Sequence, residues 1–452
     1  MIIYVDKLTA RVDYILDLML NGLVGANIKF TTNKQDFIES PQEKLSYTKS
    51  KICNEVFVPQ NSDLLYEIGI IKQQEVITNS QDPAFDLFAS AFFFASRYEE
   101  YVDKDLDKFG RYFHTSSLAY KRNILHLPII NLWAEELKCR IRATYPNIEL
   151  RERHFKFINS VDVDMAWRYK GLGFARTVAS FCFDLLQRRS IRDFRRRINV
   201  IRGKEKDPLA TFDFMLKVGR EQKTETIFFL QVGNYGRYDK NSSIKNRKFR
   251  RLIHYFYNSY LIGIHPSYNS NSVVHRVRKE VKRLLSVVGK DHISRSRFHY
   301  LRFRLPKSYN TLLECHISDD YSMGYSRATG FRSGLCTPHR FYDLTAEKKK
   351  PLTIHPFAVM DATLRYTTGT EKAFEVIKRQ MDIVKSVNGE FISIFHNQNL
   401  CEEDDWIGWR DIYTKTLAYA TEISETCKKE ASNQRETLPE EDETSQNYND
   451  IW

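Results

Sequence analysis

Residues 155–164 read Phe-Lys-Phe-Ile-Asn-Ser-Val-Asp-Val-Asp, an apolar run that ends in two carboxylates. The run predicts a buried strand with Asp162 and Asp164 at its carboxyl end. Side chains alternate between the two faces of a strand, so carboxylates two residues apart point to the same side. Two like charges in one place repel, and a divalent cation bound by one of them resolves the repulsion. The triplet Asp162-Val163-Asp164 therefore predicts a metal-assisted site.

Strands and helices alternate after this run. Strands are expected over 226–233, over 261–264 and over 391–395, with helices after Asp207 and over 371–387. Such alternation is typical of an α/β fold with parallel strands, either open or closed into a barrel. Two of the strands end at a histidine, His265 and His396, and α/β sites are built at the carboxyl ends of strands.

Polar residues at and near these strand ends suggest chemical roles, and the sequence pattern does not decide which residue has which role. His265 and His396 could supply a metal ligand and an acid. Arg332, in Gly-Phe-Arg-Ser-Gly, could orient the free carboxylate. His355 competes with His396 for the place at the last strand, and Asp361 could line the same cavity.

The segments on either side of this region differ from it. Residues 1–150 predict a small N-terminal α/β domain of unknown role, with a helix over 85–101 that is apolar nearly all round. Residues 151–425 form the domain with the alternating pattern. Residues 426–452 are acidic and unpatterned, and we expect a disordered tail there.

Composition narrows the class of protein. A hydrophobic fraction of 42% and an aromatic fraction of 13% allow real cores. Seven scattered cysteines without a CxxC pair indicate neither a disulfide framework nor a thiolate zinc site.

The N-terminus lacks the features of a secretory signal, and the longest apolar window is too short to span a bilayer. We expect a cytoplasmic protein that can reach a membrane only at its inner face.

The net charge of +12 raises nucleic acid and anionic membrane as partners. Much of the excess lies between Leu186 and Lys206, downstream of the apolar Phe181 and Phe183. A solvated helix face explains this stretch most simply, and peripheral contact with an anionic membrane is the sharper alternative. No nucleic-acid-reading motif is present, so no nucleic acid partner is expected.

Residues 151 to about 420 resemble a polysaccharide deacetylase domain, the carbohydrate esterase family that shares the rhizobial chitooligosaccharide deacetylase homology region. Five segments carry the resemblance in the family's order. They are Asn159–Asp164, Phe228–Gly233, Ile264–Tyr268, Ser318–Ser322 with Gly330–Arg332, and Ile392–Asn397. The leader before them is similar to that of a bacterial subgroup with a small N-terminal domain.

The resemblance implies a distorted (β/α) barrel, a divalent metal of the Zn²⁺ type, and removal of N-acetyl or O-acetyl groups from a glycan or a lipid-linked sugar of the bacterial cell envelope. By position, Asp162 would be the general base, and Asp164 and His265 would bind the metal. Arg332 would hold Asp162, and His396 would protonate the leaving amine.

Two positions depart from the family pattern. Val163 separates aspartates that are adjacent in most members. The family's second histidine, four residues after the first, is replaced by Asn269, whose amide oxygen binds Zn²⁺ more weakly than imidazole does. An oxygen from Asn269 is expected as the third ligand, with Ser267, Ser270 or His275 as substitutes, and the alternative is a different ion or none.

Two other functions compete with the hydrolase. Loss of the second histidine would suit a catalytically degenerate binding or scaffold protein with the same fold. The DxD triplet could also be the metal–nucleotide motif of a glycosyltransferase, although that function predicts neither His396 nor the Gly-Phe-Arg segment.

Overall fold

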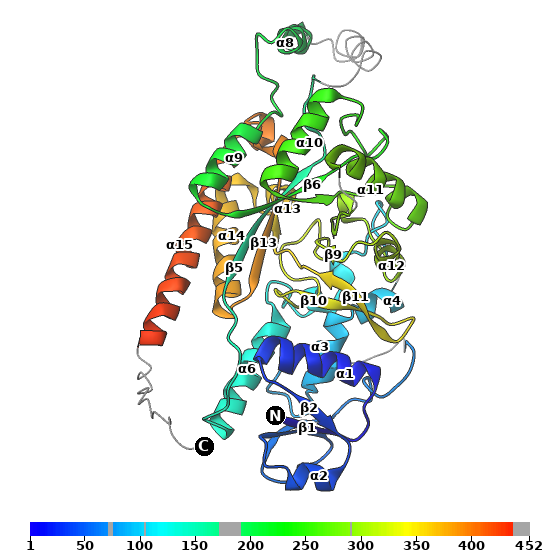
Figure 1. Cartoon of the computed structure of the whole chain (residues 1–452), viewed down its shortest axis with the longest axis vertical. Coiled ribbons are helices and arrows are strands. Elements are labelled where there is room, and N and C mark those ends of the chain that lie inside the picture. The colour runs from blue at the N-terminus through cyan, green and yellow to red at the C-terminus, as the bar shows by residue number, and fades with distance from the viewer. Residues whose placement is uncertain (71–75, 104, 171–190, 290–291, 437–452) are drawn as a thin grey trace, which may run out of the picture.

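The computed structural model describes residues 1–452 except 71–75, 104, 171–190, 290–291 and 437–452. Its strands form two sheets, which lie one above the other in Figure 1.

The smaller sheet belongs to the N-terminal region and has four parallel strands in the order β2-β1-β3-β4. Its strands are β1 Ile2–Val5, β2 Lys29–Thr31, β3 Lys44–Thr48 and β4 Val56–Pro59. The helices of this region are α1 Ala10–Leu16, η1 Asp17–Val24, α2 Lys34–Glu39, α3 Leu87–Ala95, α4 Tyr98–Val102, η2 His114–Ser116, α5 Leu118–Lys121 and α6 Ile129–Thr144.

The apolar helix expected over 85–101 is confirmed in part. Every residue of α3 is buried, as the lack of a polar face predicts. The helix then breaks at Arg97, which has a φ of 56°, and α4 continues in a new direction. This break places Glu99 and Glu100 at the contact with the larger part of the chain.

The larger sheet has nine strands in the order β10-β11-β9-β8-β7-β6-β5-β13-β12, parallel except for the β10–β11 pair. Its strands are β5 Lys156–Val163, β6 Glu225–Leu230, β7 Leu261–Ile264, β8 Arg295–Ser296, β9 Asp319–Asp320, β10 His339–Asp343, β11 Lys348–Ile354, β12 Val359–Met360 and β13 Glu390–His396.

Helices alternate with the strands of this sheet along the chain. They are α8 Ile191–Ile201, α9 Phe212–Glu221, α10 Arg247–Ser259, α11 Val274–Val288, α12 Lys307–Glu314, α13 Asp361–Thr367, α14 Gly369–Ser386 and α15 Trp409–Glu436, with 3₁₀ turns η3 His299–Leu301, η4 Asn397–Leu400 and η5 Asp404–Trp406. In Figure 1 α8 stands apart from the body at one end, and α15 runs along one side.

The α/β class predicted from the sequence is therefore confirmed, but the predicted closure of a barrel is not observed. Among the described strands, β10 and β12 are the two edges of the sheet and do not pair with each other. The predicted tail needs a correction as well. Residues 426–436, which we expected to be disordered, form the end of α15. A helical run of this length buries the apolar side of its earlier turns, including Trp409 and Tyr413.

Strand β5 shows how the sequence sorts its residues between two cores. Phe157, Val161 and Val163 pack in the large core between the sheet and the helices. Ile158 lies on the opposite face, in a second cluster with residues of β6, β12 and β13. Ser160 and Asp162 follow Ile158 on that second face because the side-chain period of a strand is two. Asp162 is thus on the same face of the sheet as Ile158 and its cluster.

The N-terminal region shares its core with the larger part of the chain. Tyr325, Leu335, Tyr342 and Leu344 are buried in the same apolar cluster as α1, α3 and α6. Arg11, which is almost fully buried, forms an ion pair with Glu347. The two regions therefore stabilise each other through a continuous interior.

One half-buried histidine, His355, packs near the sheet but away from the site described below. His355 lies between Asp319, at 3.1 Å, and Glu390, at 3.2 Å, and stacks on the ring of Tyr321. Burial opposes protonation of His355, but the two carboxylates outweigh it and raise its pKa. The two carboxylates therefore favour the protonated form of His355, and we call these contacts the His355 ion pairs.

Candidate metal centre

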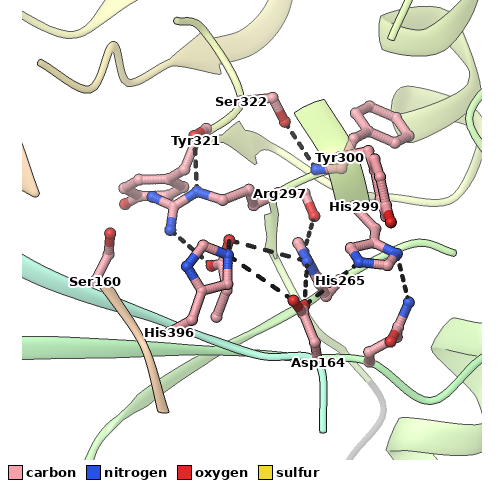
Figure 2. A network of polar contacts seen from close by, with 12 residues as sticks. Ser160, Asp164, His265, Arg297, His299, Tyr300, Tyr321, Ser322 and His396 are labelled. Carbon is pink, nitrogen blue, oxygen red and sulfur yellow. Dashed lines mark hydrogen bonds and ion pairs between the residues drawn. The ribbon is translucent and has the colours of Figure 1, made fainter. Parts of the chain in front are cut away.

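One carboxylate and two imidazoles converge at the carboxyl ends of β5, β7 and β8. Asp164, His265 and His299 each offer one ligand atom, and these atoms all lie within 4.8 Å of one another. Asp164 follows the last residue of β5, His265 follows β7, and His299 opens η3 just after β8. Figure 2 shows the two imidazoles directed toward the Asp164 carboxylate. One carboxylate oxygen and two imidazole nitrogens form a donor set that suits Zn²⁺ and related divalent ions.

The ring of His265 is held with one nitrogen toward this group. Its Nδ1 donates a hydrogen bond to the carbonyl oxygen of Arg297, at 2.5 Å, because a carbonyl can only accept. The Nδ1 atom is therefore occupied as a donor, which leaves Nε2 as the ring atom that can bind a metal. That Nε2 lies 3.1 Å from Asp164 Oδ1.

The ring of His299 is oriented in the same way by a carboxylate. Its Nδ1 lies 2.8 Å from Asp239 Oδ1, and its Nε2 lies 3.6 Å from Asp164 Oδ1. Metal-bound histidines are commonly held by such a carboxylate on the far nitrogen. Burial opposes protonation of His299, but Asp164 and Asp239 outweigh it and raise its pKa to about 9. The same surroundings would favour a bound cation in place of that proton.

The buried ligand atoms support this assignment. Asp164 Oδ1 and His265 Nε2 are both inaccessible to solvent, and neither makes a hydrogen bond of acceptable geometry to any residue that the structure describes. Buried polar atoms are nearly always paired, so two facing orphans need an explanation. A cation between them satisfies both, and the residues present therefore fit a divalent metal.

Asp162 lies beside this group with a different partner. Arg297 Nη1 donates to Asp162 Oδ1 at 2.8 Å, while Arg297 Nε donates to the carbonyl oxygen of Tyr321 at 2.9 Å. Asp162 Oδ2 is left facing the imidazoles of His265 and His396, each 3.9 Å away. The guanidinium thus holds one carboxylate oxygen and leaves the other directed into the site.

His396, the last residue of β13, lies beside Asp162 and Asp164. Its Nδ1 lies 2.7 Å from Asp361 Oδ1, and its backbone N–H donates to Asp361 Oδ2 at 2.7 Å. The other ring nitrogen, Nε2, lies 3.8 Å from Asp164 Oδ2. Burial opposes protonation of this ring, but Asp361, Asp164 and Asp162 outweigh it and raise the pKa of His396 to about 10.

These groups form the floor of a cavity of about 460 Å³. Its lining includes Asp162, Asp164, His265, His299 and His396, together with several aromatic side chains. Two residues of the N-terminal region, Phe109 and Arg111, also line it. A larger cavity of about 720 Å³ lies elsewhere, between the start of β5 and α15, and contains none of these groups.

The structure corrects the expected position of Arg332. Its guanidinium donates to both oxygens of Glu100, at 2.8 and 2.6 Å, and not to Asp162. The Gly-Phe-Arg-Ser-Gly segment lies against α4 of the N-terminal region, which supplies the carboxylate. Arg297 has taken the place beside Asp162 that the sequence assigned to Arg332.

The structure also corrects the expected ligand Asn269. Asn269 lines a separate cavity, together with Ser267, Ser270 and His275, and its backbone carbonyl accepts a hydrogen bond from Arg276. Ser267 and Ser270 are held there by the buried carboxylate of Glu280. Neither Asn269 nor any of these three alternatives lines the cavity over Asp164, where His299 offers the second imidazole.

Arg297 and His299 were missed because their strand is very short. β8 has two residues, Arg295 and Ser296, and no apolar run marks it. A signal was nevertheless present in the segment Arg297-Phe298-His299, where two polar residues alternate around a buried phenylalanine. This spacing is the same as that of Asp162 and Asp164.

Comparisons with known proteins leave the activity of this chain open. Residues 1–146 match the model of a family of unknown function, DUF7033. No curated protein matches the chain. Among solved structures, one from Mycobacterium smegmatis, described as a "putative polysaccharide deacetylase", is 12% identical and covers 63% of this chain and 94% of its own, with a TM-score of 0.38. A TM-score this low carries no argument about the present chain.

No helix among the described residues is both long enough and apolar enough to cross a membrane. The basic stretch between Leu186 and Lys206 is described only from Ile191 onward, and Phe181 and Phe183 lie outside the described residues.

Proposed function

We propose that this chain is a metal-dependent hydrolase that removes N-acetyl or O-acetyl groups from a glycan or a lipid-linked sugar. One observation carries the proposal. The Asp164–His265–His299 group lies within 4 Å of a second carboxylate, Asp162, and a second acid–base group, His396. A metal-binding set with a separate base and a separate acid is what amide hydrolysis needs.

The metal would be held by Asp164 Oδ1, His265 Nε2 and His299 Nε2. A divalent ion bound there would polarise the acyl carbonyl and make water a stronger nucleophile at neutral pH. Asp162 would take the proton from the attacking water through Oδ2, since Oδ1 is occupied by Arg297. Arg297 is a positioning residue, because it acts through Asp162.

His396 would deliver a proton to the leaving group. Asp361 accepts from its Nδ1 and fixes the ring, so that Nε2 is directed toward the Asp162 and Asp164 carboxylates. An amine is a poor leaving group unless protonated, and an acid opposite the base supplies that proton. The resemblance of the sequence to polysaccharide deacetylases implies the same division of roles for Asp162 and His396.

We further propose that the larger sheet is a distorted barrel closed by irregular backbone. The first strand of the sheet, β5, pairs with the last, β13, as closure into a ring would require. Residues 355–358 span the gap. His355 N–H donates to Asp320 O at 2.8 Å, and Ala358 N–H donates to Ile392 O at 3.1 Å. The small cluster around Ile158 and Phe229 would then fill the barrel interior.

The degenerate binding protein considered from the sequence depended on the replacement of a histidine by Asn269. His299 supplies an imidazole from another strand, so this replacement no longer argues against metal binding. We assign residues 151–425 to the hydrolase domain and residues 1–150 to an N-terminal domain that packs against it. A cytoplasmic location and contact with an anionic membrane stay predictions.

The test is metal content together with release of acetate. Purified protein should contain about one divalent ion per chain, and His299→Ala should lose it. Wild type should release acetate from N-acetylglucosamine oligomers or phosphorylated N-acetylglucosamine, whereas Asp162→Asn should not. Asp213→Asn, an exposed residue in the first turn of α9, is the matched control and should keep full activity. Equal acetate release by wild type and Asp162→Asn would remove Asp162 as the base.

A further inference from the structure

The cavity over the metal-binding group carries an uneven distribution of charge. The carboxylates among its lining residues, Asp162 and Asp164, lie on its floor beside the imidazoles. Its wall and mouth instead carry three cations, Arg111, Lys240 and Arg327. With a divalent ion on the floor, the positive groups of the cavity would clearly outnumber the negative ones.

Arg111 is already neutralised and serves to build the wall. It forms an ion pair with Asp107 at 2.6 Å, and its Nη1 donates to the carbonyl oxygen of Tyr300 at 3.1 Å. Asp107 also accepts from the backbone N–H of Phe109. The turn over 107–111 of the N-terminal region is thus a rigid element that packs against the residue following His299.

Lys240 and Arg327 differ from Arg111 because neither forms an ion pair with any carboxylate in the part of the chain that the structure describes. Both are exposed. The Lys240 ammonium lies over the ring of Tyr235, at 4.7 Å. The Arg327 guanidinium lies 5.8 Å from the ring of Tyr366. Exposed cations of this kind are usually just solvated, but these two line the same cavity as the candidate metal centre.

The mouth also offers flat apolar surfaces. Phe109, Tyr238, Tyr300, Tyr366 and Trp406 all line the cavity. Tyr366 is 67% exposed, and the guanidinium groups of Arg365 and Arg327 lie 4.9 and 5.8 Å from its ring. Exposed aromatic rings beside a polar site can stack on the apolar faces of sugar rings. The neighbouring cations Lys240 and Arg327 can bind an anionic group carried by such a sugar.

We propose that the substrate is anionic: an acylated sugar whose phosphate or carboxylate group is bound by Arg327 and Lys240. Its sugar ring would stack on Tyr366, and its acyl group would reach the floor of the cavity. Arg327 is the stronger partner of the two, because a guanidinium can bind phosphate or carboxylate with two parallel hydrogen bonds. This proposal rests on the proposed function, since it names the substrate class of that site.

The test is equilibrium binding to the full-length, zinc-loaded Asp162→Asn protein, which should not turn substrate over. The probes are neutral N-acetylglucosamine, N-acetylglucosamine 1-phosphate and N-acetylmuramic acid, which carries a carboxylate. At least one anionic probe should bind about tenfold more tightly than the neutral sugar, as a charge-assisted contact provides. The preference should shrink as salt is added. Whichever anionic probe binds more tightly distinguishes a phosphate from a carboxylate substrate.

Arg327→Gln and Lys240→Gln, made in the same background, should each lose most of this preference while zinc content and circular dichroism stay unchanged. Arg237→Gln is the matched control, because Arg237 is exposed near Lys240 but does not line the cavity. Equal affinity for neutral and anionic probes would overturn the proposal, and so would an equal loss in the Arg237→Gln control. Tight anionic binding without acetate release by wild type would support this subsite and refute the hydrolase, so the two failures are distinguishable.

Discussion

Replacing Arg297 by methionine tests which arginine serves Asp162. Methionine keeps an unbranched apolar stem against the ring of Phe229, over which the guanidinium lies at 4.3 Å. It removes the charge and the 2.8 Å hydrogen bond to Asp162. Asp162 has a side chain only 4% exposed, so the oxygen that loses Arg297 is poorly hydrated. Removal of one partner from a buried ion pair costs about 3–5 kcal/mol, and we expect a loss of stability in that range for Arg297→Met.

The matched variant Arg332→Met should behave differently. Its partner Glu100 keeps a second guanidinium, because Arg97 Nε donates to Glu100 at 2.7 Å. The remaining carboxylate is therefore still compensated, and we expect a smaller loss, about 1–3 kcal/mol. Arg332 does not contact Asp162, so kcat/KM of the folded protein should stay within a few-fold of wild type. Arg297→Met should lower kcat/KM on the order of 100-fold, since a small misplacement of a catalytic group costs that much.

Urea unfolding followed by circular dichroism gives the two stabilities, and acetate release at saturating zinc gives the two rates. Metal content is measured on both variants, so that a lost ion is not mistaken for a misplaced base. The reasoning is refuted if Arg332→Met abolishes acetate release while Arg297→Met retains it. It is also refuted if Arg297→Met is as stable as wild type, because Asp162 would then need no cation.

Three further predictions concern other parts of the chain. Asp239→Asn removes the carboxylate that orients the ring of His299. This substitution should weaken zinc affinity by about 10–100-fold in a chelator competition assay, with the fold intact. The His355 ion pairs raise the pKa of His355 in the folded protein. They therefore stabilise the fold fully at pH values below the ordinary histidine pKa, and this stabilisation is lost as pH rises through the raised pKa. Wild type should therefore exceed His355→Gln in unfolding free energy at pH 6 by more than at pH 9, and a constant difference would contradict this. Gly324→Ala would place a Cβ against the buried ring of Phe357 and should lower the free energy of unfolding by about 1–3 kcal/mol, measured by thermal unfolding. Gly22→Ala is the matched control, since its Cβ would meet no atom closer than 3.7 Å, and it should leave the stability nearly unchanged.

Much of the larger sheet could be predicted because its central strands are long and apolar. β5, β6, β7 and β13 each form a run of buried residues, and each was expected from its composition. The polar residues at the ends of β5, β7 and β13 could also be predicted to meet, since parallel strands bring their carboxyl ends to one edge. Asp162, Asp164, His265 and His396 do lie together, as this rule requires.

The remaining site residues depend on information that local sequence does not contain. Arg297 and His299 follow a two-residue strand, which is too short for any periodic signal. Arg332 was misplaced because its partner, Glu100, comes from a region far away in the sequence. A buried arginine binds whichever carboxylate the tertiary fold presents, and neither spacing nor composition shows which one that is.

The pairing of β5 with β13 has a consequence for how this protein is made. In the register of the two strands, Asp162 lies opposite His396, so the proposed base and the proposed acid meet only when almost the whole chain has left the ribosome. Until then β5 has an unpaired edge, and an exposed strand edge can join with other chains. Folding should accordingly be slow and late, because contacts so distant in sequence require the closure of a very long loop. A truncated or stalled chain that ends before β13 would hold every candidate metal ligand and still lack the proposed acid, so a partial product could bind metal without acting on substrate.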